Sequence, residues 1–237
     1  MIRGTKVYIT TVTVLFLLVI AVTIMTRFSF KGSVTLKQLQ ASNDLNDYTV
    51  QFGDDAEVND VFKTINDYDD LKEKSKVIAK VHVTDERKLS ANAVYTKVIV
   101  KDIYKSDQSF NKNDAIYIYE PVCFEEEFEI FDSSSGYQLM RTNDDYYVFL
   151  NELPTAERYV KSEKEKISFV PSTLKYSVYS TKNNKIKLLD KKRIDGDKEE
   201  YKYADVKELD ILTYNNGALD KYKIIKKNII KDLEGKI

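Results

Sequence analysis

The densest group of side chains that could do chemistry in this sequence is acidic. It comprises Glu125, Glu126, Glu127, Glu129 and Asp132. In a strand, Glu125, Glu127 and Glu129 would share one face, because side chains alternate between the two faces. Three carboxylates on one face could bind Ca²⁺, and a pair of carboxylates is what glycosidases use. We favour a third interpretation, in which these residues are solvated charges that protect a sheet edge from aggregation.

The chain has one histidine and one cysteine. We interpret His82 as a half-exposed strand residue, since a general base needs a partner and a pocket. We interpret Cys123 as a small apolar side chain at the end of a strand. One histidine and one cysteine do not make a zinc cage, and the sequence holds no Gly-x-Ser-x-Gly nucleophile motif. We therefore predict no catalytic residue, no metal ligand and no cofactor.

Tyrosine is the other abundant functional group, with 17 among 237 residues. Exposed tyrosines on a sheet are good recognition residues, because each offers a large area and a hydroxyl group. Packing in the core and at the rim of the sheet is the competing explanation, and we favour it for most of them. The tyrosines in or near predicted strands are Tyr117, Tyr119, Tyr146, Tyr147, Tyr176, Tyr179, Tyr201 and Tyr203.

The elements that must position these residues are mainly strands. Alternation with a period of two predicts strands over residues 77–83 and 94–101, both rich in β-branched residues, with a loop at 85–88 and 90–92. Further strands are predicted at residues 115–119, 146–150, 167–170, 176–179 and 186–189. Several short strands with polar turns indicate a mainly β, α+β domain built around a closed or nearly closed antiparallel barrel.

Helical spacing of apolar residues occurs at both ends of this strand-rich part. It predicts a short helix over residues 58–65, followed by a helical turn through 71–75 that Asp67 or Asp69 caps. A longer amphipathic helix covers residues 219–233, with lysines opposite its apolar face. Either this helix packs on the domain, which we favour, or it lies on anionic lipid.

The first thirty residues determine where we expect the protein to work. No charged side chain occurs from Val7 to Met25, and a helix of ~1.5 Å rise per residue would carry this run across a hydrocarbon core of roughly 30 Å. We predict an uncleaved transmembrane signal anchor over residues 7–26, with residues 1–6 in the cytoplasm. A cleaved signal peptide and a buried core helix are the alternatives, but no small-residue cleavage pair follows the run. Flanking basic residues nearly balance, and the α-amino group favours an extracytoplasmic C-terminal domain.

The remaining chain divides by composition and charge. We expect a polar stalk at residues 27–55, the barrel domain at 56–160, and C-terminal strands with the basic helix, packing on the barrel, at 161–237. Residues 27–159 hold 16 Lys and Arg against 25 Asp and Glu, whereas residues 160–237 hold 19 against 13. The acidic first part argues against nucleic-acid binding, which needs a basic footprint. Attraction between the two parts is favoured over a basic, membrane-facing tail.

The order of the predicted strands resembles a known group of proteins. The corresponding motifs span residues 75–83, 95–100, 102–105, 116–121 and 144–150. They are similar to those of uncharacterised Gram-positive envelope proteins in which an N-terminal membrane anchor precedes a small barrel like the OB and netrin/TIMP-like folds. The resemblance covers residues 68–153 and departs at Ser106 and at Asn143 or Asp144, where such proteins usually carry glycine. It implies a fold and a location, and it implies no activity.

These observations predict a single-pass membrane protein of the bacterial envelope. Its extracytoplasmic OB-like barrel would act as a protein- or ligand-interaction module with an envelope protein as partner. The alternative is a hydrolase of cell-wall or surface polymers that uses carboxylates such as Glu125, Glu127 or Asp132. Oligonucleotide binding on the barrel face is disfavoured by the acidic charge of residues 27–159.

Overall fold

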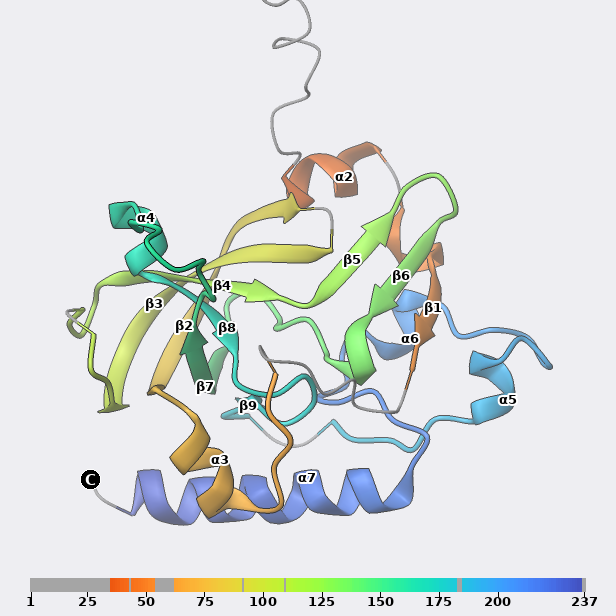
Figure 1. Cartoon of the computed structure of the whole chain (residues 1–237). Coiled ribbons are helices and arrows are strands. Elements are labelled where there is room, and N and C mark those ends of the chain that lie inside the picture. Colours follow the sequence, from red (N-terminus) through yellow and green to blue (C-terminus); the bar gives the residue numbers. More distant parts are fainter. Residues whose placement is uncertain are drawn as a thin grey trace, which may run out of the picture. The chain divides into compact units, whose positions relative to one another are not determined.

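The computed structural model of the chain describes most of the sequence from Thr35 onward, as one unit (Figure 1). The described residues are 35–42, 44–53, 62–90, 92–108, 110–182 and 185–235. The predicted anchor over residues 7–26 lies outside them. None of the helices in these ranges is long and apolar enough to cross a membrane.

The larger sheet has six strands. They are β2 (Val77–Ser90), β3 (Ala93–Lys105), β4 (Ala115–Glu120), β7 (Asp145–Glu152), β8 (Ser168–Pro171) and β9 (Val178–Ser180). Their order is β2-β3-β4-β8-β7-β9, and β7 also pairs with β2, so that the pairing returns to the strand where it began. All pairs are antiparallel except β4 with β8. The prediction of an α+β, mainly β domain is confirmed.

A smaller sheet consists of three short strands in the order β1-β6-β5. These are β1 (Thr49–Phe52), β5 (Val122–Glu125) and β6 (Ile130–Ser133). Strand β5 follows β4 with Pro121 alone between them, and it forms a hairpin with β6, against which β1 lies in parallel. The hairpin therefore extends from one end of the larger sheet (Figure 1).

Short helices connect the strands, and one long helix ends the described unit. They are α2 (Leu36–Ser42), α3 (Tyr68–Lys74), α4 (Glu163–Lys166), α5 (Lys191–Ile194), α6 (Tyr203–Val206) and α7 (Asn216–Ile229), with 3₁₀ turns η1 (Leu45–Asp47) and η2 (Ser134–Gly136) and a π-helical turn η3 (Ile230–Glu234). The predicted capped helical turn is confirmed in α3, whose N-cap Asp67 accepts a hydrogen bond from the amide of Asp70 at 2.9 Å.

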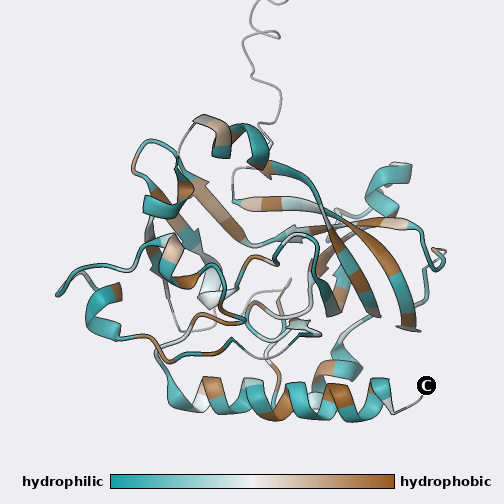
Figure 2. Cartoon of the chain, turned by 180° about the vertical axis from the view of Figure 1, so that it is seen from behind, coloured by the Kyte–Doolittle hydropathy of each residue, from teal (hydrophilic) through white to brown (hydrophobic). Residues whose placement is uncertain are grey.

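Helix α7 packs its apolar face on the strands. Apolar and hydrophilic residues recur along it (Figure 2). The apolar face belongs to one hydrophobic cluster with residues of β2, β7 and β9. In this cluster Tyr222 stacks on Tyr179 of β9, with ring centroids 4.7 Å apart. Most of the stability of such a helix comes from this burial rather than from its own propensity.

Two predictions about strands were wrong. Residues 85–88, predicted as a loop, belong to β2, which continues past a register shift between Val83 and Arg87. A bulge of this kind absorbs extra residues without ending the strand, so the polar composition was misleading. Residues 186–189 form no strand, although the segment is held to the rest of the unit by a backbone hydrogen bond from Leu189 to Thr213.

The stalk expected over residues 27–55 is corrected for its described part, Thr35 to Gly53. This part contains α2, η1 and β1, and it buries Leu39 and Tyr48 almost completely. Its apolar residues are spread among polar ones, so that its composition resembles that of a linker although the segment is folded. Strand β1 nevertheless finds a partner in β6, more than seventy residues later, and such distant pairing leaves little local trace in sequence.

Candidate functional site

The acidic residues that stood out in the sequence lie on the β5–β6 hairpin. Strand β5 ends at Glu125, residues 126–129 form the turn, and β6 begins at Ile130. Glu129 has a φ of 51°, in the left-handed region that turns use. The turn separates Glu127 and Glu129 from Glu125, so the expected shared face of three carboxylates was wrong. A turn made of four acidic and aromatic residues, without Gly, Pro or Asn, carries none of the usual sequence signals.

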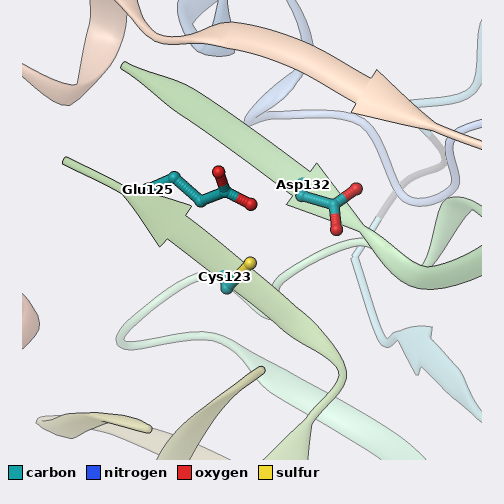
Figure 3. A group of neighbouring side chains, drawn as sticks. All are labelled: Cys123, Glu125 and Asp132. Carbon is teal, nitrogen blue, oxygen red and sulfur yellow. The ribbon is translucent and has the colours of Figure 1, made fainter. Parts of the chain in front are cut away.

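In the hairpin, the side chain of Glu125 instead lies close to those of Asp132 and Cys123 (Figure 3). Cys123 is opposite Asp132 in the register, and Glu125 is two residues further along the same strand. The Cys123 sulfur and one oxygen of each carboxylate all lie within 4.8 Å of one another. A thiolate and two carboxylates are chemically able to hold a Zn²⁺ ion that keeps a water as its fourth ligand.

The raised pKa values of Cys123 and Asp132 disfavour nucleophilic chemistry at this cluster. Burial, followed by the charges of Asp132 and Glu125, raises the pKa of the Cys123 thiol to about 11. Burial and the charge of Glu125 also raise the pKa of the Asp132 carboxyl. Because the thiolate is the reactive form, the thiol of Cys123 is unreactive near neutral pH.

A second polar group, which the sequence analysis missed, lies inside the larger sheet. Arg87 of β2 is opposite Thr96 of β3, and Glu120 ends β4. All three are buried. Glu120 accepts hydrogen bonds from the Thr96 hydroxyl at 2.5 Å, the Tyr137 hydroxyl at 3.2 Å and the Met140 amide at 2.8 Å. These bonds satisfy both oxygens of a carboxylate that has no access to solvent.

Arg87 is less completely satisfied than Glu120. Its Nη2 donates to the Met140 carbonyl and lies 3.8 Å from Glu120 Oε1. Its Nε is buried and has no hydrogen-bond partner among the described residues. Burial raises the pKa of Glu120, against the opposing effects of Arg87 and of the hydrogen bonds. A buried donor without a partner costs roughly 1–3 kcal/mol, so it calls for an explanation.

Arg87 lines a cleft of about 760 Å³. The walls come from α2 and η1, from the end of β2, from the loop before β7 and from the segments around residues 182–185 and 203–208. Six of its lining side chains are cationic, against four acidic ones. The cationic residues are Lys37, Arg87, Arg141, Lys182, Lys185 and Lys207. The cleft is therefore polar and positively charged, although the chain as a whole is not.

One wall of the cleft is fixed by ion pairs centred on Arg141. Its Nε lies 3.0 Å from Asp144 Oδ2, and its Nη2 lies 3.0 Å from Asp210 Oδ1. Lys182 also bonds Asp144, and Lys226 of α7 lies 3.1 Å from Asp210. Burial acts to raise the pKa of Asp144, but Lys182 and Arg141 outweigh it and lower that pKa. These contacts connect the loop before β7 to the C-terminal segment and to α7.

Three tyrosines gather on the outer face of β3 and β4. Tyr95 lies between Tyr117 and Tyr119, with ring centroids 4.8 Å and 4.4 Å away. The ammonium of Lys164 in α4 is 4.6 Å from the centroid of the Tyr117 ring. The Tyr95 hydroxyl is hydrogen-bonded to Ser168, and burial raises the pKa of Tyr95 to about 12. The face is thus an aromatic surface partly covered by α4.

An apolar cavity of about 620 Å³ adjoins this aromatic surface. Its lining comes from β4, from the turn between β2 and β3, and from the loop between β7 and β8. Tyr119, Leu153, Pro154 and Val170 are among the lining residues. Tyr159 also lines the cavity, and it is 53% exposed.

The single histidine joins two strands of the larger sheet. His82 of β2 is opposite Asp145 of β7 in the register, and its Nδ1 lies 2.8 Å from Asp145 Oδ1. Both side chains are about one-third exposed. The pair bridges the contact between β2 and β7, which is the pairing that returns the sheet to its first strand.

The described part of the chain is thus an α+β, sheet-rich domain that carries the polar cleft and the apolar cavity described above. Comparison with protein-family models and with curated proteins found no match to this chain.

Proposed function

We propose that β2, β3, β4, β8 and β7 form an OB-like barrel. Two observations support this. The pairing passes through these five strands in turn and returns to β2, and the one parallel pair joins the third strand to the fifth. The OB-fold is a five-stranded, partly open barrel. Strand β9 is then an addition to β7 rather than part of the barrel.

We further propose that the barrel is a protein-interaction module of the bacterial envelope. The segment at residues 7–26 is proposed to be its single-pass anchor, with the described unit outside the cytoplasm. The observation that carries the proposed interaction is the position of the apolar cavity. OB-folds bind ligands on their second and third strands, beside the loops between strands 1 and 2 and strands 4 and 5. Strand β4 and both equivalent loops line the cavity.

The chemistry of this cavity favours an apolar segment of a partner protein. Its walls are mainly aliphatic and aromatic, and Val160, next to Tyr159, is 86% exposed. Apolar side chains that remain exposed beside a hollow mark interaction sites, and tyrosine is enriched in such interfaces. An apolar side chain of the partner would fill the cavity, while Tyr159 and Val160 would be covered around it.

Site-specific photocrosslinking of the full chain in intact membranes tests this interaction. A photoreactive amino acid replaces Tyr159 or Val160, and it replaces the exposed Lys198, outside the cavity lining, as the control. We expect a discrete adduct from positions 159 and 160 but not from 198. The substitution Leu153→Asp places a charge in the cavity wall and removes the adduct, whereas Leu153→Met keeps it. An adduct that survives Leu153→Asp, or that forms equally from position 198, contradicts the proposal.

The hydrolase remains a second candidate because Glu125 and Asp132 lie close together. Carboxyl groups about 5–5.5 Å apart are typical of retaining glycosidases, and the raised pKa of Asp132 suits a general acid. Neither residue lines the polar cleft or the apolar cavity. Release of reducing ends from cell-wall polymers, abolished by Asp132→Asn and by Glu125→Gln, would support this function. Undiminished release by both variants would exclude it.

A further inference from the structure

We propose that the polar cleft is a binding site for a small organic molecule that carries one oxyanion group, a carboxylate or a phosphate, seated on Arg87. This site is separate from the apolar cavity, since the two share no lining residue. The inference therefore goes beyond the proposed interaction with a partner protein and does not depend on it.

The first argument is the state of Arg87. Its side chain is only 4% exposed, it lines the cleft, and its Nε lacks an acceptor among the described residues. Glu120, the nearest carboxylate, already accepts three hydrogen bonds from other groups. An oxyanion in the cleft would add a second negative charge beside a guanidinium whose hydrogen bonds are not all satisfied. Guanidinium groups match carboxylate and phosphate oxygens in a two-pronged geometry that lysine cannot reproduce.

The second argument is the charge around Arg87. Lys182, Lys185 and Lys207 approach the cleft from the C-terminal segments, and the side chains of the first two are 64% and 58% exposed. The Lys207 ammonium donates to the side chain of Asn46, a neutral partner, at 2.7 Å. Lys182 and Lys185 are paired with Asp144 and Glu208, which also line the cleft, whereas the hydrogen-bond partner of Lys207 is neutral. Lys207 therefore contributes most directly to the attraction of an anion that enters from solvent.

The third argument concerns the size and the class of the ligand. A cleft of about 760 Å³ is within the range of small-molecule sites and is much larger than a bare ion requires. Asp44 and Asp85 also line it, so a polyanion would meet repulsion. These carboxylates can instead accept hydrogen bonds from hydroxyl or ammonium groups of the ligand. A molecule with one oxyanion and several hydrogen-bond donors fits the cleft best.

The walls of the cleft are preorganised for such a ligand. The Met140 carbonyl holds one end of the Arg87 guanidinium, and the Arg141 ion pairs hold the loop that follows. Groups fixed in advance lose little freedom on binding, which favours affinity. The ligand would bind between the barrel and the N- and C-terminal segments that cover this end of it.

Calorimetric titration of the purified full chain in nanodiscs tests the proposal. The probes are inorganic phosphate, acetate and glycerol 3-phosphate, with chloride as the control anion. We expect at least one oxyanion probe to bind in the millimolar range or tighter, and glycerol 3-phosphate to bind more tightly than phosphate if the ligand is an organic phosphate. If none of the three oxyanion probes gives a binding heat at probe concentrations up to about 10 mM, the proposal is overturned.

Variants locate the binding in the cleft. Arg87→Lys keeps the charge but loses the two-pronged geometry, and we expect it to weaken binding by about tenfold or more. Because Arg87 is buried and its variant could fail to fold, the double variant Lys182→Gln with Lys207→Gln provides an independent test. It is expected to raise Kd by about fivefold or more, whereas Lys198→Gln, outside the cleft, leaves Kd unchanged. Equal affinity in the double variant and in the Lys198 control contradicts the proposal.

Discussion

Arg87 and Glu120 meet inside the larger sheet, with Nη2 3.8 Å from Oε1 and side chains only 4% and 0% exposed. A buried pair of opposite charges pays for desolvation with mutual attraction and hydrogen bonds, so it contributes little net stability. Removing one partner is different, because it leaves the other charge buried and unpaired. Such pairs persist where they position groups, and this pair places a guanidinium at the wall of the polar cleft.

The first prediction concerns the stability of this pair. Arg87→Met and Glu120→Leu are each expected to lower the free energy of unfolding by about 3–5 kcal/mol. The double variant is expected to lose less than the sum of the two, since it leaves no unpaired charge. Urea denaturation of the full chain measures all three, with the exposed turn variant Glu127→Gln as the control. Additive losses would show that the two side chains do not interact.

The second prediction concerns acid sensitivity through Asp144. Its pKa is lowered in the folded state by Lys182 and Arg141, which outweigh the effect of burial. The stability that it contributes is therefore complete above its unfolded pKa of about 3.9 and is lost as the pH falls through the folded pKa. The gap in unfolding free energy between the wild type and Asp144→Asn should shrink steadily below about pH 4.

Urea denaturation at a series of pH values measures that gap. Asp102→Asn provides the control, because Asp102 forms an ion pair with Lys112 in which both side chains are at least 40% exposed. Surface pairs of this kind contribute little. A gap for Asp144→Asn that is constant down to about pH 2.5 would show that the ion pairs around Arg141 do not stabilise the fold.

The third prediction concerns the thiol of Cys123. With a pKa raised to about 11, it should react with iodoacetamide at about pH 8 more than tenfold more slowly than a free cysteine. Glu125→Gln removes a neighbouring negative charge, so it lowers the pKa and raises the rate. Since Cys123 is the single cysteine of the chain, mass spectrometry follows the reaction without interference. The control variant Glu126→Gln, in the exposed turn, should leave the rate unchanged. If Cys123 of the wild type reacts as fast as free cysteine, burial and the neighbouring carboxylates do not raise its pKa.

Part of this structure could be predicted from the alternation of residues. Alternation with a period of two indicated β2, β3 and β4, in which exposed or half-buried residues alternate with buried ones over part of each strand. Strand β7 is buried on both faces, and the turn signal before its continuous apolar run indicated it instead. The position of Glu120 was also accessible, since Ile116, Ile118 and Glu120 occupy the same inward face. A carboxylate in that position must find buried partners, so the alternation in this strand already indicates a buried polar group.

The rest depends on contacts that the sequence does not encode locally. Arg87 lies an even number of residues after the inward-facing Val83, but Asp85 and Glu86 between them are exposed at the register shift, so the alternation of burial is interrupted before Arg87. Arg141 and Asp210 are 69 residues apart, and only the folded chain brings them together. The cleft cannot be predicted from the sequence because its walls come from five separate parts of the chain.

The central claim is that the described unit works outside the cytoplasm, and impermeant maleimide labelling of intact cells tests it most directly. In a Cys123→Ala background, Glu126→Cys places a thiol on the exposed β5–β6 turn, and Thr5→Cys places one in the predicted cytoplasmic segment. We expect the Cys at position 126 to be labelled in intact cells, and the Cys at position 5 to be labelled only after lysis. Labelling at position 5 in intact cells, with position 126 protected until lysis, would contradict the proposed orientation and with it the envelope function.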